Sequence, residues 1–273
     1  MKSLKFIKVV TIIGVCILII GLIIFAVGFG IDQLNGGRYT KENTQSFEKS
    51  FSEEIESLEI SVLASELNII KGSEFKIVAE NVKEESIEYN ITNKKLVIKE
   101  VHMRKWANWD FSNIYHPVVT LYIPENSEFD NIDIDIGAGS TKIEKIKAKE
   151  FYLNCGAGKV TGEDIIAEKC DIKNGAGEVY LSGVKLNNAI INTGIGKFTV
   201  SGELRGNTHM ENGVGEVNLN IKGSKSDYYI DMSNGIGGVF VNGSVYKAAD
   251  YSQDAQYRIY GSNGVGKVNI TFN

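Results

Sequence analysis

The sequence contains very little cysteine and proline, with three cysteines and two prolines in 273 residues. Cys155 and Cys170 are the only thiols beyond residue 31, so at most one disulfide can form there, and no Cys/His spacing predicts a metal site. The two prolines, beside 29 glycines, exclude collagen-like and proline-rich disordered chains. We therefore expect a folded domain that needs no metal and no cofactor.

Positive charge is also scarce after the first few residues. The chain carries 29 basic and 34 acidic residues, a formal net charge of −5. Without Lys2, Lys5 and Lys8 the remainder has 26 basic and 34 acidic residues. An acidic domain repels polyanions, so we expect no nucleic acid partner.

An uncharged apolar run extends from Val9 to Ile31, 23 residues. At ~1.5 Å per residue a helix of this length spans the ~30 Å hydrocarbon core of a membrane. The lysines before it predict a cytoplasmic tail (1–8), a single transmembrane helix (9–31) and an extracellular remainder. Cleavage as a signal peptide after Ala26-Val27-Gly28 stays open, although the run exceeds the ~7–15 apolar residues of such peptides.

Glycine triplets recur along the second half of the chain. The triplets that begin at Gly137, Gly156, Gly175, Gly194 and Gly213 are each 19 residues apart, and two looser copies follow after gaps of 22 and 29 residues. A nucleotide site needs one glycine-rich loop, whereas seven copies predict a repeat architecture. The predicted structural corners are Gly137, Gly139, Gly156, Gly158, Gly175, Gly177, Gly194, Gly196, Gly213, Gly215, Gly235, Gly237, Gly264 and Gly266.

Apolar and polar residues alternate on both sides of each triplet, which is typical of strands with one buried face. Each unit therefore contains a strand, a glycine corner, a second strand and a return loop. One unit cannot bury its own apolar face, but stacked units can. We predict an all-β, single-stack β-solenoid, similar to a parallel β-helix, with coils of about 19 residues. Calcium binding at the corners is excluded because Val160, Val179 and Val217 occupy the required ligand position.

Two polar ladders are expected between adjacent coils. Asn174, Asn212, Asn234 and Asn263 precede their triplets, where stacked asparagines can hydrogen-bond. Charges alternate just after the triplets, at Lys159, Glu178, Lys197, Glu216 and Lys267. The same register places Cys155 at a corner and Cys170 in the core. We therefore predict that these two cysteines are not joined by a disulfide.

The repeat pattern also sets the expected domain boundaries. Residues 32–56 are polar and predict a linker that holds the domain away from the bilayer. The extracellular β-solenoid is expected over 57–273, with irregular first coils or a cap at 57–125 and regular glycine repeats at 126–273. A cap would shield the open end of the stack.

One short stretch, 102–116, combines aromatic and basic side chains. Its candidate ligand- or partner-binding residues are Arg104, Trp106, Trp109, Tyr115 and His116. Exposed aromatic rings can stack on sugar rings or anchor a protein partner. Alternatively, the two tryptophans fold over the first coils and seal the core. The sequence leaves both interpretations open.

The chain resembles the bacterial putative-adhesin domain family, a group of unknown function. The resemblance covers Leu58 to Asn273 and rests on the stretch VTLYIPENSEFDNIDIDIGAG and on turns of the type NGAGEVYLSG, after an N-terminal membrane helix. It implies a surface-exposed β-solenoid, often in proteins tied to cell-envelope stress. It provides no functional residues to transfer.

Three functions remain in competition. The first is a membrane-anchored, non-catalytic surface module for binding, adhesion or envelope stress, with a cell-wall glycan or a surface or membrane protein as partner. The second is a polysaccharide-active enzyme, for which Glu163 with Asp164, or Asp133 with Asp135, are candidate carboxylate pairs. The third is an exterior module that regulates a membrane stress sensor. We favour the first because no carboxylate pair converges with a histidine or arginine in the sequence.

Overall fold

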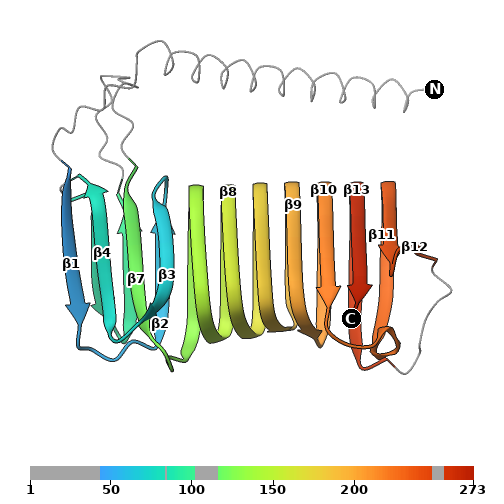
Figure 1. Ribbon diagram of the computed structural model, residues 1–273, viewed down its shortest axis with the longest axis horizontal. Helices are drawn as coiled ribbons and strands as arrows, with labels where there is room; N and C mark the ends of the chain where they lie inside the picture. Colours follow the sequence, from blue (N-terminus) through green and yellow to red (C-terminus); the bar gives the residue numbers. More distant parts are fainter. Residues whose placement is uncertain (1–43, 84, 102–115, 248–254) are drawn as a thin grey trace, which may run out of the picture. The chain divides into compact units, whose positions relative to one another are not determined.

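The computed structural model describes residues 44–83, 85–101, 116–247 and 255–273, which form an all-β domain (Figure 1). Residues 9–31 lie outside this description, and no described helix is long and apolar enough to cross a membrane. The elements are β1 (Gln45–Phe51), β2 (Ser57–Val62), β3 (Glu66–Gly72), β4 (Phe75–Val82), β5 (Ile87–Thr92), β6 (Lys95–Glu100), β7 (Val118–Pro124), β8 (Phe129–Asn187), β9 (Ala189–Arg205), β10 (Asn207–Ile221), a 3-10 turn (Lys225–Asp227), β11 (Tyr228–Val241), β12 (Ser244–Val245) and β13 (Tyr257–Phe272).

The glycine triplets form the bends of a β-solenoid-like stack, as the sequence predicts. We call the side formed by strands before the triplets the front face, the side after them the back face, and the row of triplets the corner edge. The segments that return to the next coil, such as Ile165–Ala167, form the return edge. Neighbouring coils pair in parallel; for example, Ala176 lies beside Ile195 and Gly177 beside Gly196.

Close approach between coils explains the glycines. Gly177 has φ of +136°, and a Cβ there would overlap the carbonyl oxygen of Gly158 in the preceding coil. Gly175 has no such dihedral, but its Cβ would lie 2.5 Å from the carbonyl oxygen of Gly156. Only glycine satisfies both demands without moving the coils apart.

The core runs between the two faces. The alternating positions predicted to point inward are buried: Leu153 and Val160 flank one corner, and Ile172 and Val179 the next. Cys155 and Cys170 are buried and free, which confirms that they form no disulfide. Burial from water stabilises the stack, at roughly 25 cal/mol per Å² of apolar area.

The N-terminal end of the stack is more regular than the sequence indicates. β2 and β3 form a coil without a glycine triplet, paired in parallel with the first glycine coil of β8. β6 and β7 pair in parallel with β2 and β3 on the other side. Antiparallel strands then close both faces: β5 on β6, and β4 followed by β1 on β7. β1 corrects one boundary, since Gln45–Phe51 is a strand inside the predicted linker of 32–56.

The coil order at the C-terminal end differs from the sequence order. β13 lies between β10 and β11, so the last strand of the chain is an inner coil and β11 is the outer one. The predicted asparagine ladder follows this spatial order. Asn212 donates to Asn263 at 2.7 Å, and Asn263 donates to Asn234 at 3.0 Å. Thr193 extends the ladder by donating to Asn212 at 2.6 Å.

The predicted charge ladder is present in register but without close ion pairs. Lys197 lies beside both Glu178 and Glu216, and Glu216 lies beside Lys267. Among the ion pairs of the described residues, none joins these side chains. Their contribution is therefore limited to weak, solvent-screened attraction.

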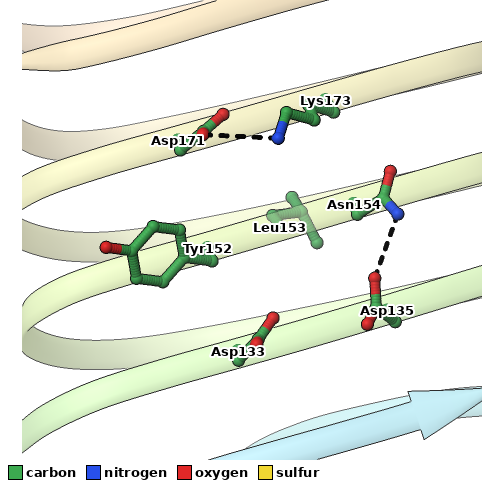
Figure 2. A pocket seen from close by; sticks show the side chains of 7 residues that line it. All are labelled: Asp133, Asp135, Tyr152, Leu153, Asn154, Asp171 and Lys173. Carbon is green, nitrogen blue, oxygen red and sulfur yellow. Dashed lines mark hydrogen bonds and ion pairs between the residues drawn. The ribbon is translucent and has the colours of Figure 1, made fainter.

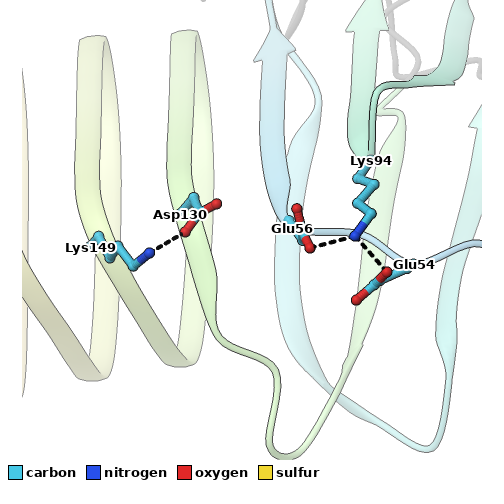
Figure 3. Close-up of polar contacts among 5 residues, drawn as sticks. All are labelled: Glu54, Glu56, Lys94, Asp130 and Lys149. Carbon is cyan, nitrogen blue, oxygen red and sulfur yellow. Dashed lines mark hydrogen bonds and ion pairs between the residues drawn. The ribbon is translucent and has the colours of Figure 1, made fainter.

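Close ion pairs occur instead among the N-terminal segments and, separately, between the first two coils of β8. Lys94 contacts Glu54 and Glu56 at 2.7 Å each, and Lys149 contacts Asp130 at 2.7 Å (Figure 3). The hydrogen bond that Lys149 donates to Asp130 is the main reason that the pKa of Lys149 is raised. The backbone N–H of Asp130 also donates to the carbonyl of Glu56 at 2.8 Å. This backbone hydrogen bond joins the residue before β2 to the start of β8, next to the parallel pairing of the two strands.

Candidate functional site

A shallow depression of about 290 Å³ lies on the front face, across three consecutive coils of β8. Figure 2 shows the side chains that line it. They are Asp133, Asp135, Tyr152, Leu153, Asn154, Asp171 and Lys173.

The alternating pattern of each coil positions these side chains. Ile132 and Ile134 point into the core, so Asp133 and Asp135 must point out from the same strand. The period of 19 residues then places Tyr152 and Asp171 in line with Asp133. Asp133 and Asp135 stand out in the sequence as a carboxylate pair, whereas the other lining residues do not. The available signal was polar residues four and two positions before consecutive triplets.

Asp133 occupies an unfavourable electrostatic environment. Burial raises the pKa of its carboxyl, and the neighbouring carboxylates of Asp135 and Glu59 raise it further. Glu59 lies directly beside Asp133 on β2 and is itself neutralised by Lys95 at 2.5 Å and Lys99 at 2.8 Å. Hydrogen bonds from these two lysines lower the pKa of Glu59. The two lysines therefore neutralise Glu59, and the pKa of Asp133 stays raised.

The other polar groups are only partly satisfied within the protein. Asp135 accepts a hydrogen bond from Asn154 at 3.0 Å. Asp171 lies 3.5 Å from Lys173 through one carboxylate oxygen, while its other oxygen is buried without a hydrogen-bond partner in the structure. A buried carboxylate oxygen without a partner is costly. A ligand on the surface cannot reach that oxygen, but the half-exposed carboxylate of Asp133 and the exposed carboxylate of Asp135 can accept hydrogen bonds from a polar ligand.

Tyr152 supplies an aromatic wall. Its hydroxyl donates to Glu150 at 2.6 Å and receives a hydrogen bond from Lys169 at 3.1 Å. In Figure 2 this hydroxyl points away from Asn154. The two contacts hold the ring in place beside the carboxylates. A ring next to hydrogen-bonding groups suits a ligand with both apolar and hydroxyl-bearing faces, such as a sugar.

Nearly all of the predicted binding stretch lies outside the described residues. Arg104, Trp106, Trp109 and Tyr115 lie outside the described residues, and His116, which follows them, is exposed. Whether the tryptophans bind a partner or seal the core therefore stays a prediction. The described neighbours Glu100 and Pro117 show only that the stretch connects β6 to β7.

The remaining sequence candidates do not form a site. Asp164 is at a left-handed turn position with φ of 54° next to Gly183, remote in the coil from the depression. Over the described part of the chain, no group of three or more His, Cys, Asp or Glu side chains could hold a metal ion. The corner glycines are packed against the neighbouring coil.

Several solved structures are similar to this chain. A putative cell adhesion protein from Clostridium sporogenes is 20% identical, with a TM-score of 0.45 over 85% of this chain and 100% of its own. A putative adhesin from Bacteroides fragilis is 10% identical, with a TM-score of 0.49 over 82% of this chain and 96% of its own. A putative lipid binding protein from Parabacteroides distasonis is 12% identical, with a TM-score of 0.41 over 83% of this chain and 97% of its own.

No curated protein matches the sequence significantly. The model of one protein family matches residues 55–273, which include nearly all of the described coils. The chain therefore belongs to the Toastrack DUF4097 family, the group of adhesin-like domains that its repeats resemble.

Proposed function

We propose that this protein is a non-catalytic module on the cell surface that binds a cell-wall glycan through the front-face depression. Residues 9–31 hold it in the cell membrane, with the N-terminus in the cytoplasm. The observation that carries the proposal is the combination of Tyr152 with the half-exposed carboxylate of Asp133 and the exposed carboxylate of Asp135 on a rigid sheet. Asp133, Asp135 and Asp171 outnumber the single cation Lys173, so the depression favours neutral or amine-bearing sugars over acidic ones.

The rigidity of the stack supports binding. Every lining residue comes from β8, whose coils are hydrogen-bonded on both sides. A preorganised surface loses little conformational entropy when a ligand binds. A repetitive ligand such as a polysaccharide can also extend along the front face over successive coils.

A sedimentation experiment tests this proposal. The full-length protein in nanodiscs is mixed with purified sacculi stripped of anionic polymers. We expect wild type to sediment with them, and Tyr152→Ala to do so about tenfold more weakly, a loss of about 1.4 kcal/mol. The matched control is Tyr180→Ala, because Tyr180 is 46% exposed but lies on the back face of the same stack. Equal sedimentation of both variants would exclude the depression as the binding site.

One observation favours the enzymatic alternative. Asp133, whose pKa is raised, lies on the same strand and face as Asp135. Glycoside hydrolases pair a carboxylic acid of raised pKa with an ionised carboxylate. If this pair were catalytic, wild type would release soluble fragments from the sacculi and Asp133→Asn would not. We expect no release from either protein.

A further inference from the structure

Four branched aliphatic side chains form a row on the corner edge, where each is the middle residue of a glycine triplet. Their exposed fractions are 61% for Ile195, 47% for Val214, 43% for Val265 and 73% for Ile236. Val214 lies beside Ile195 and Val265, and Val265 lies beside Ile236. Consecutive members are therefore about 4.8 Å apart along the stack. We call these four residues the aliphatic row.

The fold does not require this row. The first three triplets carry Ala138, Ala157 and Ala176 at the same position, in the same kind of corner. The larger side chains therefore add exposed apolar area without filling the core. A contiguous exposed apolar patch of this kind marks a contact surface.

The surroundings of the aliphatic row contain little charge. The residues before the triplets are Thr193, Asn212, Asn263 and Asn234, and those after them include Lys197, Glu216 and Lys267. The strip thus has one net positive charge in a chain with a net charge of −5. A neutral to weakly basic apolar strip suits the interfacial region of a membrane with anionic lipids.

The chain enters the domain at this same edge. Gln45 at the start of β1 pairs with Val82 at the end of β4. Two residues earlier in β4, Glu80 pairs with Val118 of β7. Val118 in turn pairs with Glu66, the first residue of β3 after the first corner. Between Ile31 and Gln45 there are 13 residues. A chain of this length spans at most about 45 Å. A membrane anchor at residues 9–31 would therefore hold the corner edge close to the bilayer.

We propose that the aliphatic row contacts the outer surface of the lipid bilayer, so that the corner edge lies along the membrane. The row and the start of β1 are at opposite ends of this edge, and both reach the membrane only in that orientation. The front face then stands upright and open to the cell wall. This inference rests on the membrane anchoring within the proposed function.

Depth-dependent fluorescence quenching tests the orientation. The full-length protein with Cys16→Ala carries one added cysteine, Ile236→Cys or the control Ile166→Cys, labelled with an environment-sensitive dye. Ile166 is also an exposed aliphatic residue, 39% exposed, but it lies on the return edge. Cys155 and Cys170 are buried, and burial raises the pKa of both thiols, so they react slowly. Each protein is reconstituted into phosphatidylcholine–phosphatidylglycerol liposomes that contain a lipid quencher at headgroup depth.

We expect about twofold or stronger quenching at position 236 and little at position 166. Failure of the protein to float with the liposomes would reject the anchoring, and the orientation with it. Flotation with equal or no quenching at the two positions would overturn the orientation alone. Dye self-quenching at position 236 that rises with protein density would assign the row to a second copy of the chain, and would also overturn the inference.

Discussion

The carboxylate of Glu100 accepts the backbone N–H of Leu63 at 2.7 Å. The same oxygen accepts the N–H groups of Ala64 and Ser65 at 3.1 and 3.2 Å. In the next coil, the N–H of Ala138, which is level with Ala64, donates to the carbonyl of Leu63 at 2.7 Å. Glu100 therefore replaces the carbonyl groups of a preceding corner at the point where the run of regular corners begins.

Removal of this carboxylate should destabilise the first coil. We expect Glu100→Ala to lower the free energy of unfolding by about 1.5–3 kcal/mol, because three amides lose a charged acceptor. Urea denaturation of the full-length protein in detergent measures the change. Glu80→Ala is the control, since Glu80 is an exposed carboxylate on β4. Equal stability of the two variants would show that water replaces Glu100 without cost.

The corner glycines allow a test of close approach separately from backbone strain. Gly177 and Gly243 both have positive φ, but a Cβ would overlap a carbonyl oxygen only at Gly177, because nothing lies within 4 Å at Gly243. We expect Gly177→Ala to cost about 1–3 kcal/mol more than Gly243→Ala. Thermal unfolding of both variants measures the difference. Similar losses would mean that the coils separate easily.

The asparagine ladder should depend on its central member. Asn263 is buried, accepts from Asn212 and donates to Asn234 and to the carbonyl of Gly266. Asn263→Ala leaves these partners unsatisfied and should cost about 1–3 kcal/mol. Hydrogen exchange should show faster opening of β13 and β11, and no acceleration there would argue against the coil order β10, β13, β11.

Asp133 makes stability depend on pH in a predictable direction. Its pKa in the folded protein is raised above the ordinary aspartate value of 3.8, mainly by burial and then by Asp135 and Glu59. The folded state therefore binds more protons than the unfolded state just above pH 3.8. The contribution of Asp133 to the free energy of unfolding falls as the pH rises from 3.8 through its folded pKa. We expect Asp133→Asn to be more stable than wild type at pH 7, with the difference vanishing below pH 3.8. A variant that is less stable at pH 7 would contradict this electrostatic account.

Much of the fold could be predicted from the sequence, because the 19-residue period and the alternation around each triplet determine which side chains face inward. The position of β13 could not. Every coil presents similar edges to its neighbours, so the repeat allows Asn212 to pair equally with Asn234 or with Asn263. The connecting segments decide the order, and they carry no repeat signal. Gln45–Phe51 was missed because its polar side chains form an exposed outer strand.

The candidate site was only partly predictable. Asp133 and Asp135 are visible as a pair on one strand, but the role of Tyr152 and Asp171 depends on the exact stacking of three coils. The partly unsatisfied state of Asp171 is a property of packing that composition does not reveal. The role of the aromatic stretch around Trp106 and Trp109 stays a prediction from the sequence.

Calorimetric titration of the full-length protein in nanodiscs with a chitin oligosaccharide, with the sugar recovered afterwards for mass spectrometry, tests non-catalytic glycan binding most directly. We predict saturable heat for wild type and Tyr180→Ala, about tenfold weaker binding for Tyr152→Ala, and recovered sugar of unchanged length. The absence of saturable heat with wild type, equal affinity in all three proteins, or a shortened sugar would contradict the account.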